Sequence, residues 1–169
     1  MQKPELQKRG VLPPNFDIRE FVSPAIFAAR GKQAIQNTTL FQFNYAHMLR
    51  VFSGGAIVIN NYHIGGERVA SGTRDRNMKP NGGGAFSTHY HALALDVQSL
   101  ILNPRQIHEL IHDEFNAFFE IGLTTLEDLR FTFPTNGSGR GWTHGDGRMY
   151  AAATLLNIER KKKFVIIEP

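Results

Sequence analysis

One stretch decides the fold: Ser87-Thr88-His89-Tyr90-His91-Ala92-Leu93-Ala94-Leu95-Asp96-Val97. It contains a predicted strand and two side chains that can bind a metal, His89 and Asp96. Residues 90–97 alternate with a two-residue period, which predicts a β-strand that carries Asp96 on its face of small side chains. His89 stands seven residues before Asp96, and an odd separation within one straight strand places two side chains on opposite faces. The two can therefore converge only if His89 lies in the loop before the strand, or beside a bulge. Such a pair suits Zn²⁺, which also needs a third protein ligand and, in catalytic sites, one open position.

The rest of the pattern predicts an α+β fold with a small, mainly antiparallel sheet and flanking helices. Segments 39–52 and 103–122 repeat apolar residues with helical spacing, and Asn103-Pro104 supplies a cap and a preset first turn. Segments 56–59, 123–133, 141–146 and 164–167 predict further strands, with a hairpin turn at the Gly-, Asn- and Ser-rich segment 135–139. The glycine-rich segment 65–85 predicts a long loop. This order lacks βαβ regularity, which excludes a doubly wound sheet.

Length and composition predict one folded domain behind an N-terminal arm. A chain of 169 residues fits a single core. Residues 1–15 are polar and contain three prolines, so we expect an arm there and the domain at 16–169. The N-terminus is not apolar and no stretch approaches the ~18 apolar residues of a membrane span, so we expect neither a secretion signal nor a membrane span.

The charge and the lack of cysteine limit the partners and the ligands. The formal net charge of +4 favours polyanionic partners, such as nucleic acid, anionic lipid or the acidic polymers of a bacterial wall. The longest cationic run, Arg160–Lys163, has no interleaved aromatic residues, so we expect no nucleic-acid partner. With no cysteine, any metal must bind to nitrogen and oxygen atoms.

Three motifs follow one another along the chain: Ser71-Gly72-Thr73-Arg74, Ser87-x-His89-x6-Asp96 and Trp142-x-His144-x-Asp146-x-Arg148. They resemble those of the zinc D-alanyl-D-alanine carboxypeptidase and L-alanyl-D-glutamate endopeptidase superfamily, which shares its fold with the hedgehog signalling domain. The likeness covers most of residues 16–148, and the run Ile57–Asn61 with a following Gly-Gly pair is similar to the branch carried by bacteriophages.

The resemblance implies a zinc ion held by His89, Asp96 and His144. It also implies that Arg74 holds a substrate carboxylate or the developing oxyanion, for which a planar guanidinium is well suited. Ser87 and Asp146 are expected to support the ligands from the second coordination shell. The family pattern Ser-x-His-x-x-Gly-x-Ala-x-Asp has glycine where this chain has Ala92.

The general base departs from the family pattern. Many relatives carry an acid three residues before the last histidine, where this chain has Gly141. Glu127 is the expected substitute, because a hairpin would place it on the strand beside His144, within reach of the attacking water. Asp146 is the alternative base.

A second zinc motif lies on the predicted helix 103–122. His108-Glu109-Leu110-Ile111-His112 fits H-E-x-x-H, which places two imidazoles on one helix face with a glutamate as base. No downstream segment offers a clear third ligand, so this zincin hypothesis is the alternative metal site.

The resemblance implies a peptidase that cuts peptidoglycan stem or cross-bridge peptides. A basic chain of this kind fits a phage lytic enzyme (an endolysin) that is made in the cytoplasm of the infected bacterium and acts on the cell wall after release, or an enzyme carried in the virion among other virion proteins. The alternative is a non-catalytic virion or tail component that keeps the fold as a binding module.

Overall fold

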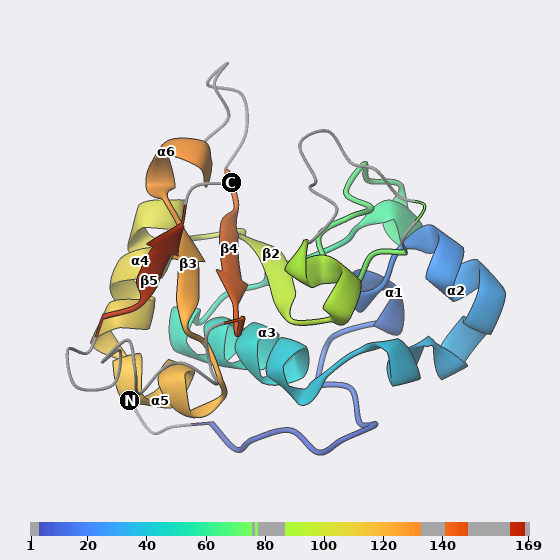
Figure 1. Ribbon diagram of the computed structural model, residues 1–169, viewed down its shortest axis with the longest axis horizontal. Helices are drawn as coiled ribbons and strands as arrows, with labels where there is room; N and C mark the ends of the chain where they lie inside the picture. Colours follow the sequence, from blue (N-terminus) through green and yellow to red (C-terminus); the bar gives the residue numbers. More distant parts are fainter. Residues whose placement is uncertain (1–3, 76, 78–86, 133–140, 149–162, 168–169) are drawn as a thin grey trace.

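The structure, a computed structural model, describes residues 4–75, 77, 87–132, 141–148 and 163–167, and within these ranges five strands form one open sheet (Figure 1). The strand order is β1-β2-β4-β3-β5, and every pair is antiparallel except β3 and β5. Helices flank this sheet, which confirms the predicted α+β class. The strands are β1 (Ile57–Val58), β2 (Ala94–Ser99), β3 (Thr125–Glu127), β4 (Thr143–Asp146) and β5 (Val165–Ile167).

The two principal helices begin at caps that the sequence encodes. Helix α3 (Leu40–Ser53) starts with a capping box between Thr39 and Gln42 and ends at Gly54 in the left-handed conformation. Helix α4 (Pro104–Asp113) starts with a capping box at Asn103 and with proline in its first turn. The short helical segments are α1 (Ile18–Phe21), α2 (Pro24–Arg30), η1 (Gly31–Asn37), η2 (Tyr62–Ile64), η3 (Thr88–His91), α5 (Phe115–Glu120) and α6 (Leu129–Thr132).

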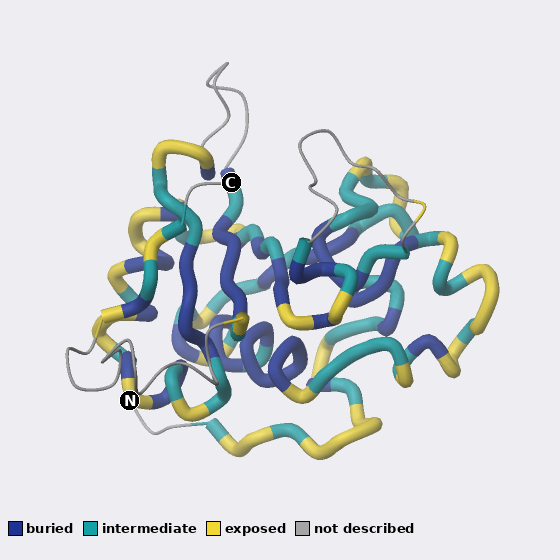
Figure 2. Tube along the Cα trace, viewed as in Figure 1, coloured by how far each residue is buried: buried dark blue, intermediate teal, exposed yellow. Residues whose placement is uncertain are grey.

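Helix α3 packs against one face of the sheet, and the side chains on the other face point away from this helix. Leu95 and Val97 of β2 belong to the buried hydrophobic core, as do most apolar residues of α3. Much of α3 is coloured as buried in Figure 2. Tyr45 of α3 lies against Gly145 of β4, where an added Cβ would stand 2.5 Å from the Tyr45 hydroxyl oxygen. Because side chains alternate along a strand, the residues on either side of Gly145 point away from α3.

Residues 90–93 do not form the predicted start of a strand. The 3-10 helix η3 ends there, and Ala92 adopts the left-handed conformation with φ 56° and ψ 29°. Its main-chain N–H bonds back to the carbonyl groups of Thr88 and His89, which closes the turn. Strand β2 therefore begins only at Ala94. Glycine would adopt this positive φ without a steric cost.

We expect Ala92→Gly to stabilise the protein by about 0.5–1 kcal/mol, because the left-handed conformation costs an L-residue more than glycine loses in backbone entropy. Ala94→Gly is the matched control, since Ala94 is buried in β2 and has no positive φ. That control should destabilise the fold. Urea unfolding midpoints measure both effects, and an Ala92→Gly protein less stable than wild type would contradict the strain at this turn.

Two longer predicted elements are also interrupted. The predicted helix 103–122 breaks at Glu114, where φ −99° and ψ 31° separate α4 from α5. The predicted strand 123–133 ends at Glu127, because Asp128 binds the main-chain N–H of Arg130 and starts the short helix α6. Strands β3 and β4 are antiparallel, as the hairpin prediction requires, but along the chain the short helix α6 lies between the two strands.

Some predictions fall wholly or partly outside the described residues. The turn at 135–139 lies outside them, and only Lys163 of the cationic run 160–163 lies inside. Of the predicted loop 65–85, residues 65–75 and 77 are described and contain no helix or named strand. The arm at 1–15 stays a prediction, although the main-chain N–H of Gln7 donates to the Asn44 side chain. Within the part of the chain that the structure describes, no helix is long and apolar enough to cross a membrane.

Candidate metal centre

Strand register places Asp96, His144 and Glu127 in one row across the sheet. Asp96 of β2 pairs directly with His144 of β4. On the other side of β4, Thr125 pairs with Asp146 and Leu126 with Gly145, so Glu127 follows beside His144 in the same register. All three side chains share the face that is turned away from α3.

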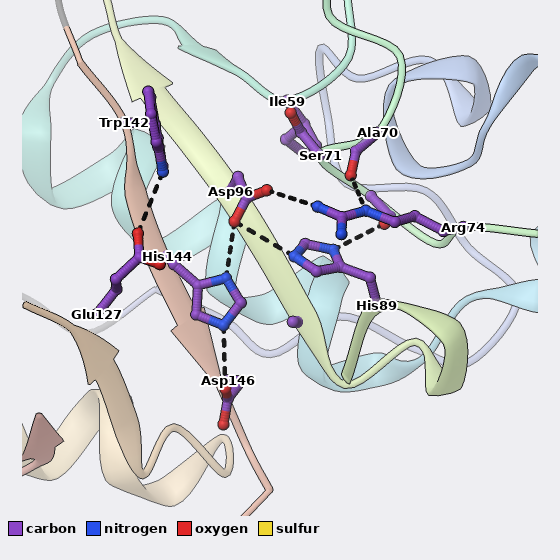
Figure 3. Close-up of polar contacts among 12 residues, drawn as sticks. Ile59, Ala70, Ser71, Arg74, His89, Asp96, Glu127, Trp142, His144 and Asp146 are labelled. Carbon is purple, nitrogen blue, oxygen red and sulfur yellow. Dashed lines mark hydrogen bonds and ion pairs between the residues drawn. The ribbon is translucent and has the colours of Figure 1, made fainter. Parts of the chain in front are cut away.

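Three potential ligand atoms converge at this row. His144 Nδ1 lies 2.7 Å from Asp96 Oδ1, and His89 Nε2 lies 3.3 Å from the same oxygen (Figure 3). One nitrogen or oxygen atom from each of the three residues lies within 4.8 Å of the others. His89 reaches the site because η3 precedes β2, as the odd spacing to Asp96 requires. The chain therefore brings together all three predicted metal ligands.

The hydrogen bonds of both rings leave the converging nitrogens available to a metal. His89 Nδ1 donates to the Gly72 carbonyl at 2.9 Å, so Nε2 faces Asp96 without a proton in the neutral ring. His144 Nε2 donates to Asp146 Oδ2 at 3.0 Å, which leaves Nδ1 for the metal. Two imidazole nitrogens and one carboxylate oxygen can hold a metal ion, and this donor set suits zinc.

Arg74 contacts the Asp96 carboxylate directly. Its guanidinium lies 3.2 Å from Asp96 Oδ2, and its Nε donates to the Ala70 carbonyl. This ion pair occupies one oxygen of Asp96 and leaves Oδ1 directed at the two imidazoles. Arg74 thus lies at the site, where it orients a ligand in addition to the substrate contact that the resemblance implies.

Arg68 is a site residue that the sequence did not reveal. Its Nε donates to the Ile59 carbonyl at 2.8 Å, and its Nη2 donates to Ser71 Oγ at 2.9 Å and to the Asp96 carbonyl at 3.1 Å. The guanidinium therefore fixes the main chain of β2 behind Asp96. Nothing in a glycine-rich, charged segment distinguishes such an arginine from an exposed one.

Charge and burial set the protonation of the metal-free site. Burial alone would raise the pKa of Asp96, but the adjacent imidazoles of His89 and His144 hold that pKa well below its usual range. Burial lowers the pKa of His89, which favours the neutral form of this ring, although the Asp96 carboxylate opposes the change. Burial also acts to lower the pKa of His144, but the hydrogen bonds to Asp146 and Asp96 outweigh it and raise the pKa to about 9.

Zinc affinity should rise with pH because zinc must displace the proton on His144 Nδ1. In the metal-free protein, protonation of His144 stabilises the fold fully below pH ~6.5, which is the pKa of histidine in an unfolded chain. This stabilisation is lost as the pH rises through about 9, the pKa of His144 in the folded state. Zinc takes the place of that proton, so the dissociation constant should fall about tenfold per pH unit below this value. Competition with a chromophoric chelator at pH 6, 7 and 8 measures how the zinc dissociation constant depends on pH. An affinity independent of pH would contradict a protonated His144.

Glu127 lies beside the cluster without belonging to it. It is partly buried, and burial raises its pKa although the charge of His144 opposes the change. Trp142 Nε1 donates to Glu127 Oε2 at 3.3 Å, and this hydrogen bond holds the carboxylate in place (Figure 3). A carboxylate with a raised pKa near a metal site can accept and return a proton. Trp142 is a contact that was not predicted, although it belongs to the motif Trp142-x-His144.

The two residues expected in the second shell differ in their contacts. Asp146 is fully buried and accepts a hydrogen bond from His144, one of the three candidate ligands. Ser87 precedes η3, and its carbonyl accepts a hydrogen bond from Tyr90. Within the described ranges, no hydrogen bond joins the Ser87 hydroxyl to a ligand residue.

The alternative histidines of α4 lie elsewhere in the fold. His108 is buried, and burial, with the charge of His112, lowers its pKa to about 4. The His112 ring packs against Phe164 with 5.4 Å between the ring centroids. Among the described residues, no third nitrogen or carboxylate group joins these two histidines in a potential metal site.

Comparison with known proteins adds no relative. No protein-family model, no curated protein and no solved structure matches this chain.

Proposed function

We propose that the chain is a zinc-dependent peptidase that hydrolyses peptidoglycan stem or cross-bridge peptides. The observation that carries this proposal is the convergence of His89 Nε2, Asp96 Oδ1 and His144 Nδ1 beside a carboxylate, Glu127, that is not one of the three ligands. Catalytic zinc sites combine three protein ligands with an open position, and peptide hydrolysis also needs a proton acceptor near that position.

Zinc is the metal that this ligand set favours. Neutral imidazole and carboxylate ligands in a three-residue site suit Zn²⁺, whereas Mg²⁺ and Ca²⁺ prefer sites built from oxygen alone. Both histidines are buried, and each has a hydrogen-bond acceptor on its outward ring nitrogen, as is usual for zinc-bound histidine.

Each catalytic residue has a role that follows from its position. When bound, zinc acts as a Lewis acid and makes water a better nucleophile at neutral pH. Glu127 accepts the proton of the attacking water and returns it to the leaving amine, for which its raised pKa is suited. Arg74 keeps Asp96 in place and carries positive charge at the edge of the site, where it can attract a substrate carboxylate or stabilise the oxyanion.

Peptidoglycan is the substrate that the motifs and the charge support together. The three ordered motifs resemble cell-wall peptidases, and the net charge of +4 favours an acidic polymer. The phage-type likeness suggests a lytic enzyme that reaches the wall from the infected cytoplasm, or an enzyme carried in the virion.

Digestion of purified cell walls tests this function. Zinc-loaded protein should release new amino groups but no new reducing ends, because a peptidase cuts amide bonds and leaves the sugar chain intact. Removal of zinc with a chelator should stop the release, and added zinc should restore it. Protein that sediments with the walls but releases no amino groups from any wall type would instead support the non-catalytic virion component.

A further inference from the structure

The described residues include three Asp-x-Arg segments in which the arginine binds the aspartate two residues before it, through both its main-chain N–H and its side chain. These are Asp17–Arg19, Asp128–Arg130 and Asp146–Arg148. Only in the third segment, among the described residues, does a histidine nitrogen share the carboxylate. His144 Nε2 lies 3.0 Å from Asp146 Oδ2.

Burial also distinguishes the third segment. The Asp146 side chain is 0% exposed, whereas that of Asp17 is 40% exposed. A buried carboxylate loses its hydration and needs hydrogen bonds and a counter-charge from the protein. Arg148, whose side chain is 38% exposed, supplies them from the surface.

The contacts of Arg148 determine where the Asp146 carboxylate points. The main-chain N–H of Arg148 binds Oδ1 at 3.0 Å, and its Nε binds Oδ2 at 2.7 Å. Oδ2 is the oxygen that accepts the hydrogen bond from His144 Nε2. Arg148 therefore fixes both oxygens of the carboxylate that His144 contacts. A half-turn of the His144 ring about the Cβ–Cγ bond would put Cδ2 in the place of Nδ1 and Cε1 in the place of Nε2, so an acceptor at Nε2 favours the orientation with Nδ1 towards Asp96.

We propose that Arg148 is a positioning residue for the metal centre, which acts through Asp146 to fix the His144 ring with Nδ1 as the metal ligand. This inference rests on the metal site of the proposed function. Arg148 itself binds neither the metal nor the other two ligands. Its side chain binds Asp146, and Asp146 binds His144, so two consecutive hydrogen bonds connect the exposed Arg148 to the metal centre.

Zinc affinity tests this role without an assay of activity. Arg148→Gln should weaken zinc binding by about 10–100-fold, which is the usual effect of losing an outer-shell partner, as measured by competition with a chromophoric chelator. Arg148→Lys should recover only part of the affinity, because an ammonium group lacks the planar fork. The matched control is Arg19→Gln, which removes the same Asp-x-Arg contact far along the chain and should leave the affinity unchanged.

A double variant separates a positioning role from a general loss of stability. If Arg148 acts through Asp146, then Arg148→Gln with Asp146→Asn should bind zinc no more weakly than Asp146→Asn alone. Long-range ¹H–¹⁵N NMR of the zinc-loaded protein should show His144 protonated at Nε2 in wild type and mixed ring states in Arg148→Gln. Circular dichroism confirms that each variant is folded.

Two outcomes overturn different claims. Wild-type affinity in a folded Arg148→Gln protein, or additive losses in the double variant, would overturn the role of Arg148 and leave the proposed function intact. A wild-type protein that binds no zinc would overturn the metal centre on which the proposed function depends.

Discussion

Replacing His144 by alanine is expected to abolish stoichiometric zinc binding. His144 supplies one of three converging ligand atoms, and its Nδ1 lies 2.7 Å from Asp96 Oδ1. Loss of a direct ligand should cost more than the ~10–100-fold that loss of an outer-shell partner costs. Elemental analysis of the purified variant after dialysis measures the metal content. His89→Ala should give the same result and serves as the second variant, because His144→Ala also leaves the buried Asp146 without its histidine partner.

The matched controls for this prediction are His108→Ala and His112→Ala. These residues form the H-E-x-x-H motif of α4, and the described residues offer them no third ligand. Both variants should keep one zinc ion per chain. Full zinc in folded His144→Ala together with loss of zinc from the α4 variants would favour the zincin site.

Glu127→Gln is expected to keep zinc and the fold but to lose activity on cell walls by about 10²–10⁴-fold, the usual contribution of a positioned proton acceptor. Glutamine preserves the size of the side chain, and its amide oxygen can still accept the hydrogen bond from Trp142 Nε1. It cannot take a proton from water. Amino-group release and zinc content should be measured on the same preparations.

Glu109→Gln is the control for the general base. Glu109 is the exposed glutamate of the α4 motif, and it would be the base if that motif were catalytic. We expect this variant to retain wild-type activity. An active Glu127→Gln protein would remove Glu127 from the mechanism and favour Asp146, the alternative base, which accepts a hydrogen bond from His144.

The three candidate ligands were predicted from the resemblance of their motifs, and the fold brings them together. The odd spacing of His89 and Asp96 required His89 to precede the strand, and η3 places it there. The antiparallel pairing of β3 and β4 brought Glu127 beside His144, as the hairpin prediction requires. These features depend on alternation and on strand pairing, both of which a sequence reveals.

The features that were missed depend on conformations or contacts that have no periodic signal. The left-handed turn at Ala92 occurs at a residue that rarely adopts positive φ, so the alternation of residues 90–93 predicted a strand that does not form there. The break at Glu114 separates two helices whose apolar spacing continues across it. Arg68 binds main-chain carbonyl groups of β2 and of the segment after β1, and these meet only in the folded chain.

Anomalous diffraction at the zinc edge, from crystals of the zinc-loaded protein, locates the metal directly. The proposed site requires one strong peak about 2.0–2.2 Å from His89 Nε2, Asp96 Oδ1 and His144 Nδ1. In that structure, His144 Nε2 should still bind Asp146. A peak at His108 and His112, or no peak near the three proposed ligands, would contradict the metal centre.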